Sequence, residues 1–301
     1  MRSGKIRNKR SATLSVYFSC MIFFLFVSGC TEVLITKRKS LQIVPRSQIL
    51  TLSDHYYNKV LAESILSTDQ EKVETVQRVG KRIAEAAGKV LADSGRRNQI
   101  KNYQWEFIVI ENDKMVNAFG LPDGKVALFT GMFRYIRDES ELAVVIGHEV
   151  AHIIAGHSNE RMSRGLSNSS GNNAVICYAK RIEKETEIQN ICKYNAGTLT
   201  CHEKKVNAET EVQQNCSYPR RTQFSKLILL QEYEADRIGL ILMAKAGFDP
   251  NAAIHFWQKM KKREGNRNVG FLSNHPDSAS RIADFKLYIP EALSYYQMSE
   301  N

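Results

Sequence analysis

Two histidines four residues apart, set in an apolar stretch, constrain this chain more than any other feature. The stretch Ala143-Val144-Val145-Ile146-Gly147 runs directly into His148-Glu149-Val150-Ala151-His152. Asp138 followed by Glu141 is typical of a helix N-terminus, so we predict a helix that runs from Asp138 to about Ala155. Because four residues turn through about 400° on a helix, both imidazoles lie on one face of it.

This pair of imidazoles predicts a zinc site. His148 and His152 can bind one Zn²⁺, and Glu149 can take a proton from water at the metal. The alternative is two ordinary helix histidines with satisfied hydrogen bonds, which would leave two rings and a carboxylate on a buried helix. On a continuing helix His157 would lie about 140° away from His152 and could not bind the same metal. We therefore expect His157 to be a polar residue at the helix end.

A catalytic zinc needs a third protein ligand and one open position. The metzincin pattern would place glycine and histidine where this chain has Ala155 and Ser158, so that class is excluded. Further along the chain, Glu232 and Asp236 are four residues apart on a helix predicted over 223–246. One can bind zinc while the other accepts the distal N–H of a ligating histidine. Alone this spacing usually marks a solvated helix face, but apolar neighbours indicate that the helix is buried.

The rest of the chain predicts an α+β domain in which helices surround one small sheet. Helical spacing of apolar residues predicts a helix from Ser53 or Asp54 and another from about Ser67. Alternating and β-branched residues predict three strands, and helical patterns return near the C-terminus. The strands are expected over 105–110, 116–119 and 125–129, and the last helices over 250–263 and 277–288.

The N-terminus is typical of an export signal. Five basic residues and no acidic ones lie in residues 1–30, which also contain a long apolar stretch. Val27-Ser28-Gly29-Cys30 resembles a bacterial lipobox, so we predict a signal peptide over 1–29, acylation of Cys30 and a lipidated polar tether over 30–52. The alternative is a retained transmembrane anchor, since about 19 apolar or small residues nearly span a bilayer.

Both alternatives place the body of the protein outside the cytoplasm. Thr31, which stands where some lipoproteins have aspartate, favours sorting to the outer membrane, with the inner membrane as the alternative. The N-terminal basic residues account for half of the formal net charge of +10. The remainder is only moderately basic and has no nucleic-acid-binding motif, so nucleic acid is not an expected partner.

Taken together, the two motifs resemble the Glu-zincin peptidase family of the CAAX prenyl proteases, the heat-shock protease HtpX and the mitochondrial Oma-type proteases. The resemblance rests on the HEVAH sequence and on Glu232-Tyr233-Glu234-Ala235-Asp236-Arg237-Ile238-Gly239. Other matching segments are Asn117-Ala118-Phe119-Gly120-Leu121-Pro122-Asp123-Gly124, Phe129-Thr130-Gly131, His275-Pro276 and Arg281-Ile282. It implies a mainly helical, zincin-type metallopeptidase domain with a small mixed sheet over 53–164 and 222–290, followed by a tail over 291–301.

The resemblance also implies roles for the site residues: His148, His152 and Glu232 would bind one Zn²⁺, Glu149 would be the general base, and Asp236 would orient a ligand. No run of about 18 apolar residues follows residue 30, so the chain resembles the periplasmic lipoprotein branch rather than the polytopic prenyl proteases. The implied function is a lipid-anchored zinc endopeptidase acting on misfolded or partly assembled envelope proteins, with the outer-membrane assembly machinery as a candidate partner. The alternative is a chaperone or assembly factor that keeps the zinc fold without essential proteolysis.

Three further features leave more than one role open. His275 could donate a hydrogen bond to an oxyanion, bind zinc as a fourth ligand that keeps the enzyme latent, or cap the helix over 277–288. Arg281 could position the loop that carries His275 or add positive charge at the oxyanion. Asn117, Ala118, Phe119 and Gly120 could form an edge strand that binds extended peptide through main-chain hydrogen bonds, or a plain structural strand.

An insertion over 165–221 separates the two zinc motifs and departs from the family pattern. A linker rich in serine, asparagine and glycine precedes two similar 16-residue sequences, each with a cysteine at both ends. We predict that they form a helical hairpin over 177–216. Antiparallel packing selects the nested disulfides Cys177–Cys216 and Cys192–Cys201, which would stabilise a hairpin with few apolar residues. Metal binding by the four cysteines is the alternative, and the hairpin could cover the cleft or dock a partner.

Overall fold

The computed structural model describes most of the chain and gives it sixteen elements within the parts that it describes. These parts are residues 30–168, 191–195, 198–202, 221–262, 271, 275 and 278–299. The first elements are β1 (Cys30–Glu32), β2 (Lys39–Leu41), α2 (Arg46–Glu63), α3 (Gln70–Asp93), α4 (Arg97–Ile100), β3 (Glu106–Ile110), β4 (Ala118–Gly120) and β5 (Lys125–Phe129). They are followed by η1 (Thr130–Arg134), α5 (Glu139–Ala155), α6 (His157–Asn168), β6 (Ile191–Asn195), β7 (Thr198–His202), α9 (Arg221–Lys245), α10 (Ala252–Lys261) and α12 (Ser278–Ser299).

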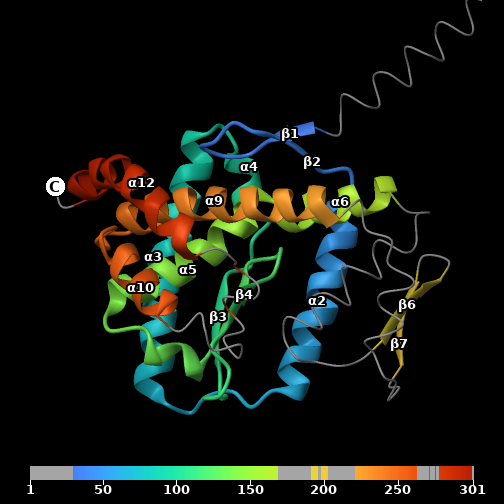
Figure 1. Cartoon of the computed structure of the whole chain (residues 1–301). Helices are drawn as coiled ribbons and strands as arrows, with labels where there is room; N and C mark the ends of the chain where they lie inside the picture. Colours follow the sequence, from blue (N-terminus) through green and yellow to red (C-terminus); the bar gives the residue numbers. More distant parts are fainter. Residues whose placement is uncertain are drawn as a thin grey trace, which may run out of the picture.

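Helices surround one small mixed sheet, which confirms the predicted α+β class (Figure 1). The strand order is β3-β5-β4, with β3 parallel and β4 antiparallel to the central strand β5. The expected strands are present, although β4 is a short three-residue strand. None of the helices in the described ranges is long and apolar enough to cross a membrane, and the predicted signal peptide over 1–29 lies outside those ranges.

Helix α5 has the boundaries that the sequence predicts. The Asp138 side chain accepts a hydrogen bond from the backbone N–H of Glu141 at 2.9 Å and so caps the first turn. At the other end Gly156 adopts a left-handed conformation with φ of 71°, which ends the helix and redirects the chain into α6. Every residue from Glu141 to Ala155 is buried, so this helix is the centre of the domain.

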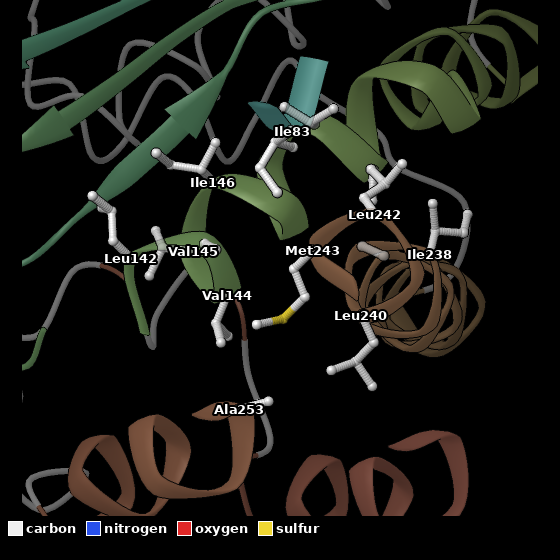
Figure 2. Packing of buried hydrophobic residues seen from close by; sticks show 14 of the residues in the cluster. Ile83, Leu142, Val144, Val145, Ile146, Ile238, Leu240, Leu242, Met243 and Ala253 are labelled. Atoms are coloured by element: carbon white, nitrogen blue, oxygen red, sulfur yellow. The ribbon is translucent and has the colours of Figure 1, made fainter. Parts of the chain in front are cut away.

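Helix α9 packs along α5 and crosses it at two glycines (Figure 1). A Cβ atom built on Gly147 would lie 3.0 Å from the carbonyl oxygen of Gly239, and one on Gly239 would lie 3.0 Å from the backbone nitrogen of His148. Only residues without a side chain allow two helix backbones to approach this closely. Around the crossing, apolar side chains of α3, α5, α9 and α10 form one continuous core (Figure 2).

Residues 30–52 are part of the folded domain, not the polar tether that the sequence suggested. Strands β1 and β2 pair as a short hairpin, and α2 begins at Arg46, earlier than the expected start at 53 or 54. Val33 and Leu34 are only 1% exposed. The segment includes the basic run Lys37-Arg38-Lys39, which is typical of a solvated chain, but Arg38 lies between two buried carboxylates on α6 and α9.

The chain after residue 290 also differs from the expectation of a separate tail. Helix α12 continues to Ser299 and passes through Pro290. Ile289 and Ala292 belong to the main core cluster. Their apolar side chains face the body of the domain, and this burial extends the helix beyond the predicted end near 288.

Within the insertion, the structure describes two strands where we expected the facing ends of two helices and the connection between them. β6 and β7 pair antiparallel, and Cys192 lies opposite Cys201 in their register. The sequences Ile-Cys-Lys-Tyr-Asn and Thr-Leu-Thr-Cys-His are rich in β-branched and aromatic residues, which favour strands. The helical prediction is therefore wrong for Ile191, Cys192, Cys201 and His202, the residues of these strands that it included. The disulfides stay predictions, and Cys177 and Cys216 lie outside the described residues.

The close crossing predicts that Gly239→Ala destabilises the protein by about 1–3 kcal/mol, because the new methyl group meets backbone atoms that cannot rotate away. Gly88→Ala is the matched control, since a Cβ there has nothing within 4 Å. In the interior of α3 this control should stabilise the protein by about 0.5–1 kcal/mol. Urea unfolding of both variants measures the two effects, and equal stabilities would contradict the role of the crossing.

Candidate metal centre

The crossing of α5 and α9 brings together three residues that the sequence indicated as ligands. The Nε2 atoms of His148 and His152 are 3.0 Å apart. From α9, Glu232 places Oε2 3.2 Å from Nε2 of His148 and Oε1 3.4 Å from Nε2 of His152. All three side chains are buried. They form a possible metal site.

His275, which precedes α12 in the sequence, joins this group. Its Nδ1 atom lies 2.7 Å from Oε2 of Glu232 and 3.0 Å from Nε2 of His148. The four ligand atoms of His148, His152, Glu232 and His275 all lie within 4.8 Å of one another. The structure therefore places His275 among the ligand atoms.

The chemistry of this group fits zinc. Nitrogen and oxygen ligands about 2.1 Å from a tetrahedral zinc lie roughly 3.4 Å from one another, close to the separations seen here. The ring nitrogens of His148, His152 and His275 face one point. Without a cation between them, their lone pairs or hydrogens would repel one another. In addition, Oε1 of Glu232 is buried and accepts no hydrogen bond within the described parts of the chain. A divalent cation would satisfy all of these atoms.

Asp236 and Arg281 support the group from behind. Oδ1 of Asp236 lies 3.0 Å from Nδ1 of His148, on the side of the ring away from the other ligands. Arg281 is fully buried over the Trp257 ring; it donates from Nε to Asp236 Oδ2 at 2.6 Å and from Nη1 to the His275 carbonyl at 3.3 Å. Its contacts therefore hold Asp236 and the backbone of His275.

Glu149 and strand β4 lie beside the ligand group. Oε1 of Glu149 is 3.3 Å from Nε2 of His275, and the side chain is 3% exposed. β4 pairs with β5 alone among the described strands, and a Cβ on Gly120 would lie 3.2 Å from the Glu149 carbonyl oxygen. Asn117 is buried and its Oδ1 accepts the N–H of Ala118 at 3.0 Å. The strand therefore runs directly along the helix that carries both histidines.

The pKa shifts of two of the ligands, Glu232 and His152, suit a bound cation. Burial opposes ionisation of Glu232, but the imidazoles of His275, His152 and His148 that face it outweigh this cost and hold the pKa of Glu232 well below its usual range. Burial lowers the pKa of His152 well below its ordinary value. At neutral pH the carboxylate is therefore ionised and the His152 ring is neutral, which are the forms that bind metal.

Sequence reasoning missed a buried set of residues behind His152. His157 is fully buried, with its Nδ1 atom 2.7 Å from Nδ1 of His152 and its Nε2 atom 3.2 Å from Oε2 of Glu234. Arg38 from the β1–β2 hairpin bridges Glu234 and Glu160. The signal was present in the sequence: Glu234 lies between Glu232 and Asp236 on a buried helix, and a buried carboxylate requires a partner.

A cavity of about 570 Å³ borders the same region. It lies among the N-terminal hairpin, α2 and the junction of α5 and α6, and His152 is one of its lining residues. Arg46, Arg96 and Tyr103 contribute polar and aromatic groups to its wall. None of these three residues was indicated by the sequence motifs.

Comparison with known proteins agrees with this geometry. Residues 72–288 match the sequence profile described as Peptidase family M48. The chain belongs to peptidase family M48. Family M48 peptidases use zinc, and the four buried ligand atoms could hold one ion. The match spans both helices that supply the ligands and includes His275.

Alignments with individual relatives include a larger share of this chain than of the relative. The "Mitochondrial metalloendopeptidase OMA1" of Schizosaccharomyces pombe is 32% identical over 70% of this chain and 53% of its own length. The protein of the same name in Saccharomyces cerevisiae is 25% identical over 98% of this chain and 78% of its own. The "Beta-barrel assembly-enhancing protease" of Escherichia coli (strain K12) is 28% identical over 79% of this chain and 43% of its own. The chain thus spans about half the length of the fission yeast protein.

The buried Arg38–Glu160 pair predicts a specific pH dependence of stability. Burial opposes ionisation of Glu160, but hydrogen bonds from Arg38 and Gln231 outweigh it and lower its pKa from 4.5 to about 2. A folded-state pKa below the unfolded value means that this stabilisation is present above pH 4.5 and disappears as the pH falls towards 2. The shift corresponds to on the order of 3 kcal/mol.

Glu160→Gln should therefore be less stable than the wild type at neutral pH, and the difference in free energy of unfolding should shrink as the pH falls below 4.5. Urea unfolding of both proteins at a series of pH values measures it. A difference that stays constant down to the lowest pH at which both proteins fold would contradict the prediction.

Proposed function

We propose that this chain is a zinc-dependent endopeptidase that cleaves misfolded or partly assembled proteins of the bacterial envelope. The observation that carries the proposal is the convergence of His148, His152 and Glu232 at one point, with Glu149 beside them. Membership of peptidase family M48 supports the same chemistry.

The residues divide the hydrolysis among them. Zinc, when bound, supplies a Lewis acid that polarises a carbonyl and lowers the pKa of water to near 7. The Glu149 carboxylate accepts a proton from the attacking water and passes it to the amine of the broken peptide bond. One water is consumed, and a carboxylic acid and an amine are formed. Asp236 keeps the His148 ring oriented, and Arg281 holds Asp236.

Substrate binding is assigned to the edge of β4. The segment Asn117, Ala118, Phe119 and Gly120 runs beside α5, and an extended peptide could add to its edge through main-chain hydrogen bonds. This mode of binding depends on the backbone rather than on particular side chains. It therefore suits a peptidase that acts on many unfolded segments.

The proposed location is the periplasmic face of the outer membrane, through a lipid on Cys30. The lipobox-like sequence supports the anchor, and the name of the Escherichia coli relative connects a similar protein with β-barrel assembly. The assembly machinery is accordingly the proposed partner. Mass spectrometry of the N-terminal peptide isolated from membranes tests the anchor, since an unmodified Cys30 would exclude it.

Glu149→Gln should abolish casein digestion, with a rate loss of at least about 100-fold, because the amide cannot accept the proton of water. A chelator should abolish digestion by the wild type. The matched control is Glu139→Gln, which changes an exposed carboxylate in the first turn of the same helix. Metal analysis and circular dichroism verify that both variants retain zinc and fold.

Digestion of casein by Glu149→Gln at the wild-type rate would refute the proposed general base. If the variant instead lost digestion but kept its role in cells, the protein would act as a chaperone or assembly factor. The same substitution therefore separates an endopeptidase from the alternative that keeps only the zinc fold.

We propose that His275 is a latch that would occupy the fourth coordination position of a bound zinc ion. The position of its Nδ1 atom among the other ligand atoms supports this role over that of an oxyanion donor. A catalytic zinc site needs one open position for water. The His275 side chain would therefore have to leave this position before water and substrate could enter.

His275→Ala should raise casein digestion at saturating zinc, because the variant leaves the fourth position open. Zinc content is measured in parallel, since the loss of one ligand weakens metal binding and could mask the gain. A fall in activity at full zinc occupancy would instead assign His275 as a donor to the oxyanion.

A further inference from the structure

His148 and His152 each have a partner at the ring nitrogen Nδ1, which points away from the proposed metal, but the two partners differ. His148 contacts the carboxylate of Asp236 directly. His152 contacts another imidazole, that of His157, which in turn contacts the carboxylate of Glu234. His157 lies outside the group of ligand atoms and is fully buried.

The distances define one consistent arrangement of hydrogens. If His152 directs the lone pair of Nε2 towards the other ligands, its single N–H is on Nδ1. This N–H then donates to Nδ1 of His157 across 2.7 Å. His157 must carry its own hydrogen on Nε2, which donates to Oε2 of Glu234 across 3.2 Å. The chain of bonds thus selects one tautomer for each ring.

Glu234 is itself held by the N-terminal hairpin. Thr36 Oγ1 donates to Oε1 of Glu234 at 2.7 Å, and Arg38 donates to both carboxylate oxygens at 2.9 and 2.8 Å. The other edge of the Arg38 guanidinium donates to both oxygens of Glu160 at 2.8 and 2.6 Å. A planar guanidinium that binds two buried carboxylates has little freedom to move.

The backbone that carries these two donors is strained. Ile35 and Lys37, on either side of Thr36, have φ of 66° and 57°, a region that residues with side chains rarely adopt. Ile35 is β-branched, which makes this conformation more costly. Strain of this kind persists only where surrounding contacts impose it, and it is common at functional sites. Here it presents Thr36 and Arg38 to Glu234.

We propose that His157, Glu234 and Arg38 are positioning residues for His152, so that the N-terminal hairpin completes the metal centre. The relay fixes the tautomer and the orientation of the ring without touching the metal or substrate. It rests on the proposed zinc site, because a ligand needs positioning only if it binds the ion. Metal-ligating histidines generally depend on such partners for affinity.

The test measures zinc affinity of the full chain at neutral pH by competition with a chromophoric chelator. His157→Phe keeps the ring volume but removes both hydrogen bonds, and it should weaken zinc binding by about 10- to 100-fold. His157→Gln should restore most of the affinity, since its amide can accept from His152 and donate to Glu234. Arg38→Met should weaken binding in the same direction.

Arg237→Met is the matched control. Arg237 also makes a two-bond ion pair from α9, with Glu291, but this pair is not connected to His152. The control should therefore keep the wild-type zinc affinity even if it lowers the melting temperature. A merely structural role for the relay would instead make zinc affinity follow stability in all variants.

Wild-type zinc affinity in His157→Phe would overturn the relay, as would equal losses in His157→Phe and His157→Gln. If His157→Phe fails to fold, the comparison of Arg38→Met with Arg237→Met decides: equal affinities overturn the proposal, and weaker binding by Arg38→Met supports it. Failure of the wild type to bind one zinc ion would be a different result, since it would refute the metal centre itself.

Discussion

The crossing of α5 and α9 at Gly147 and Gly239 is the constraint on which the rest of the structure depends. Helices that meet through larger side chains keep their axes about 8–10 Å apart, whereas these two have backbone atoms in near contact. Gly147 directly precedes His148, and Gly239 lies two turns after Glu232. The absence of two side chains therefore places the carboxylate of one helix within reach of both imidazoles of the other.

A second constraint follows from the charges that this crossing buries. Within five residues α9 carries Glu232, Glu234 and Asp236, all nearly or fully buried. Buried carboxylates are costly unless each is paired and hydrogen-bonded. Glu232 faces the imidazoles of the metal centre, Asp236 binds Arg281, and Glu234 binds Arg38 and Thr36. Distant segments thus become necessary parts of the domain because they supply the compensating groups.

Prediction from the sequence succeeded for those features that depend only on local signals. The limits of α5 and the positions of the strands depend on local signals: the Asp138 cap, the glycine after Ala155 and the alternation of apolar residues. The spacing of His148 and His152 likewise places both rings on one helix face. Such features hold for an isolated segment, so they can be deduced without knowledge of its neighbours.

The predictions that were wrong concern residues whose structure depends on partners far away in the sequence or on competing local signals. The segment with Arg38 looked like a solvated tether because its partners, Glu160 and Glu234, lie more than 100 residues away in the sequence. His157 was expected to lie at a helix end, and it does begin α6, but the left-handed Gly156 turns the chain so that its ring faces His152. The ends of β6 and β7 that fall within the two repeats were mistaken for helix because the charge and length of the repeats outweighed the β-branched residues in the prediction.

The sequence alone therefore determined the helix that carries the paired histidines, the strands of the sheet, the family and the kind of metal. The helix and the strands follow from residue identity and spacing along a single element, whereas the family and the metal follow from several motifs taken together. Only the tertiary structure decided which carboxylate faces which ring, that His275 lies among the ligand atoms, and that the N-terminal hairpin reaches the back of His152. Those contacts join segments far apart in the chain, and they depend on the angle and distance at which whole helices pack.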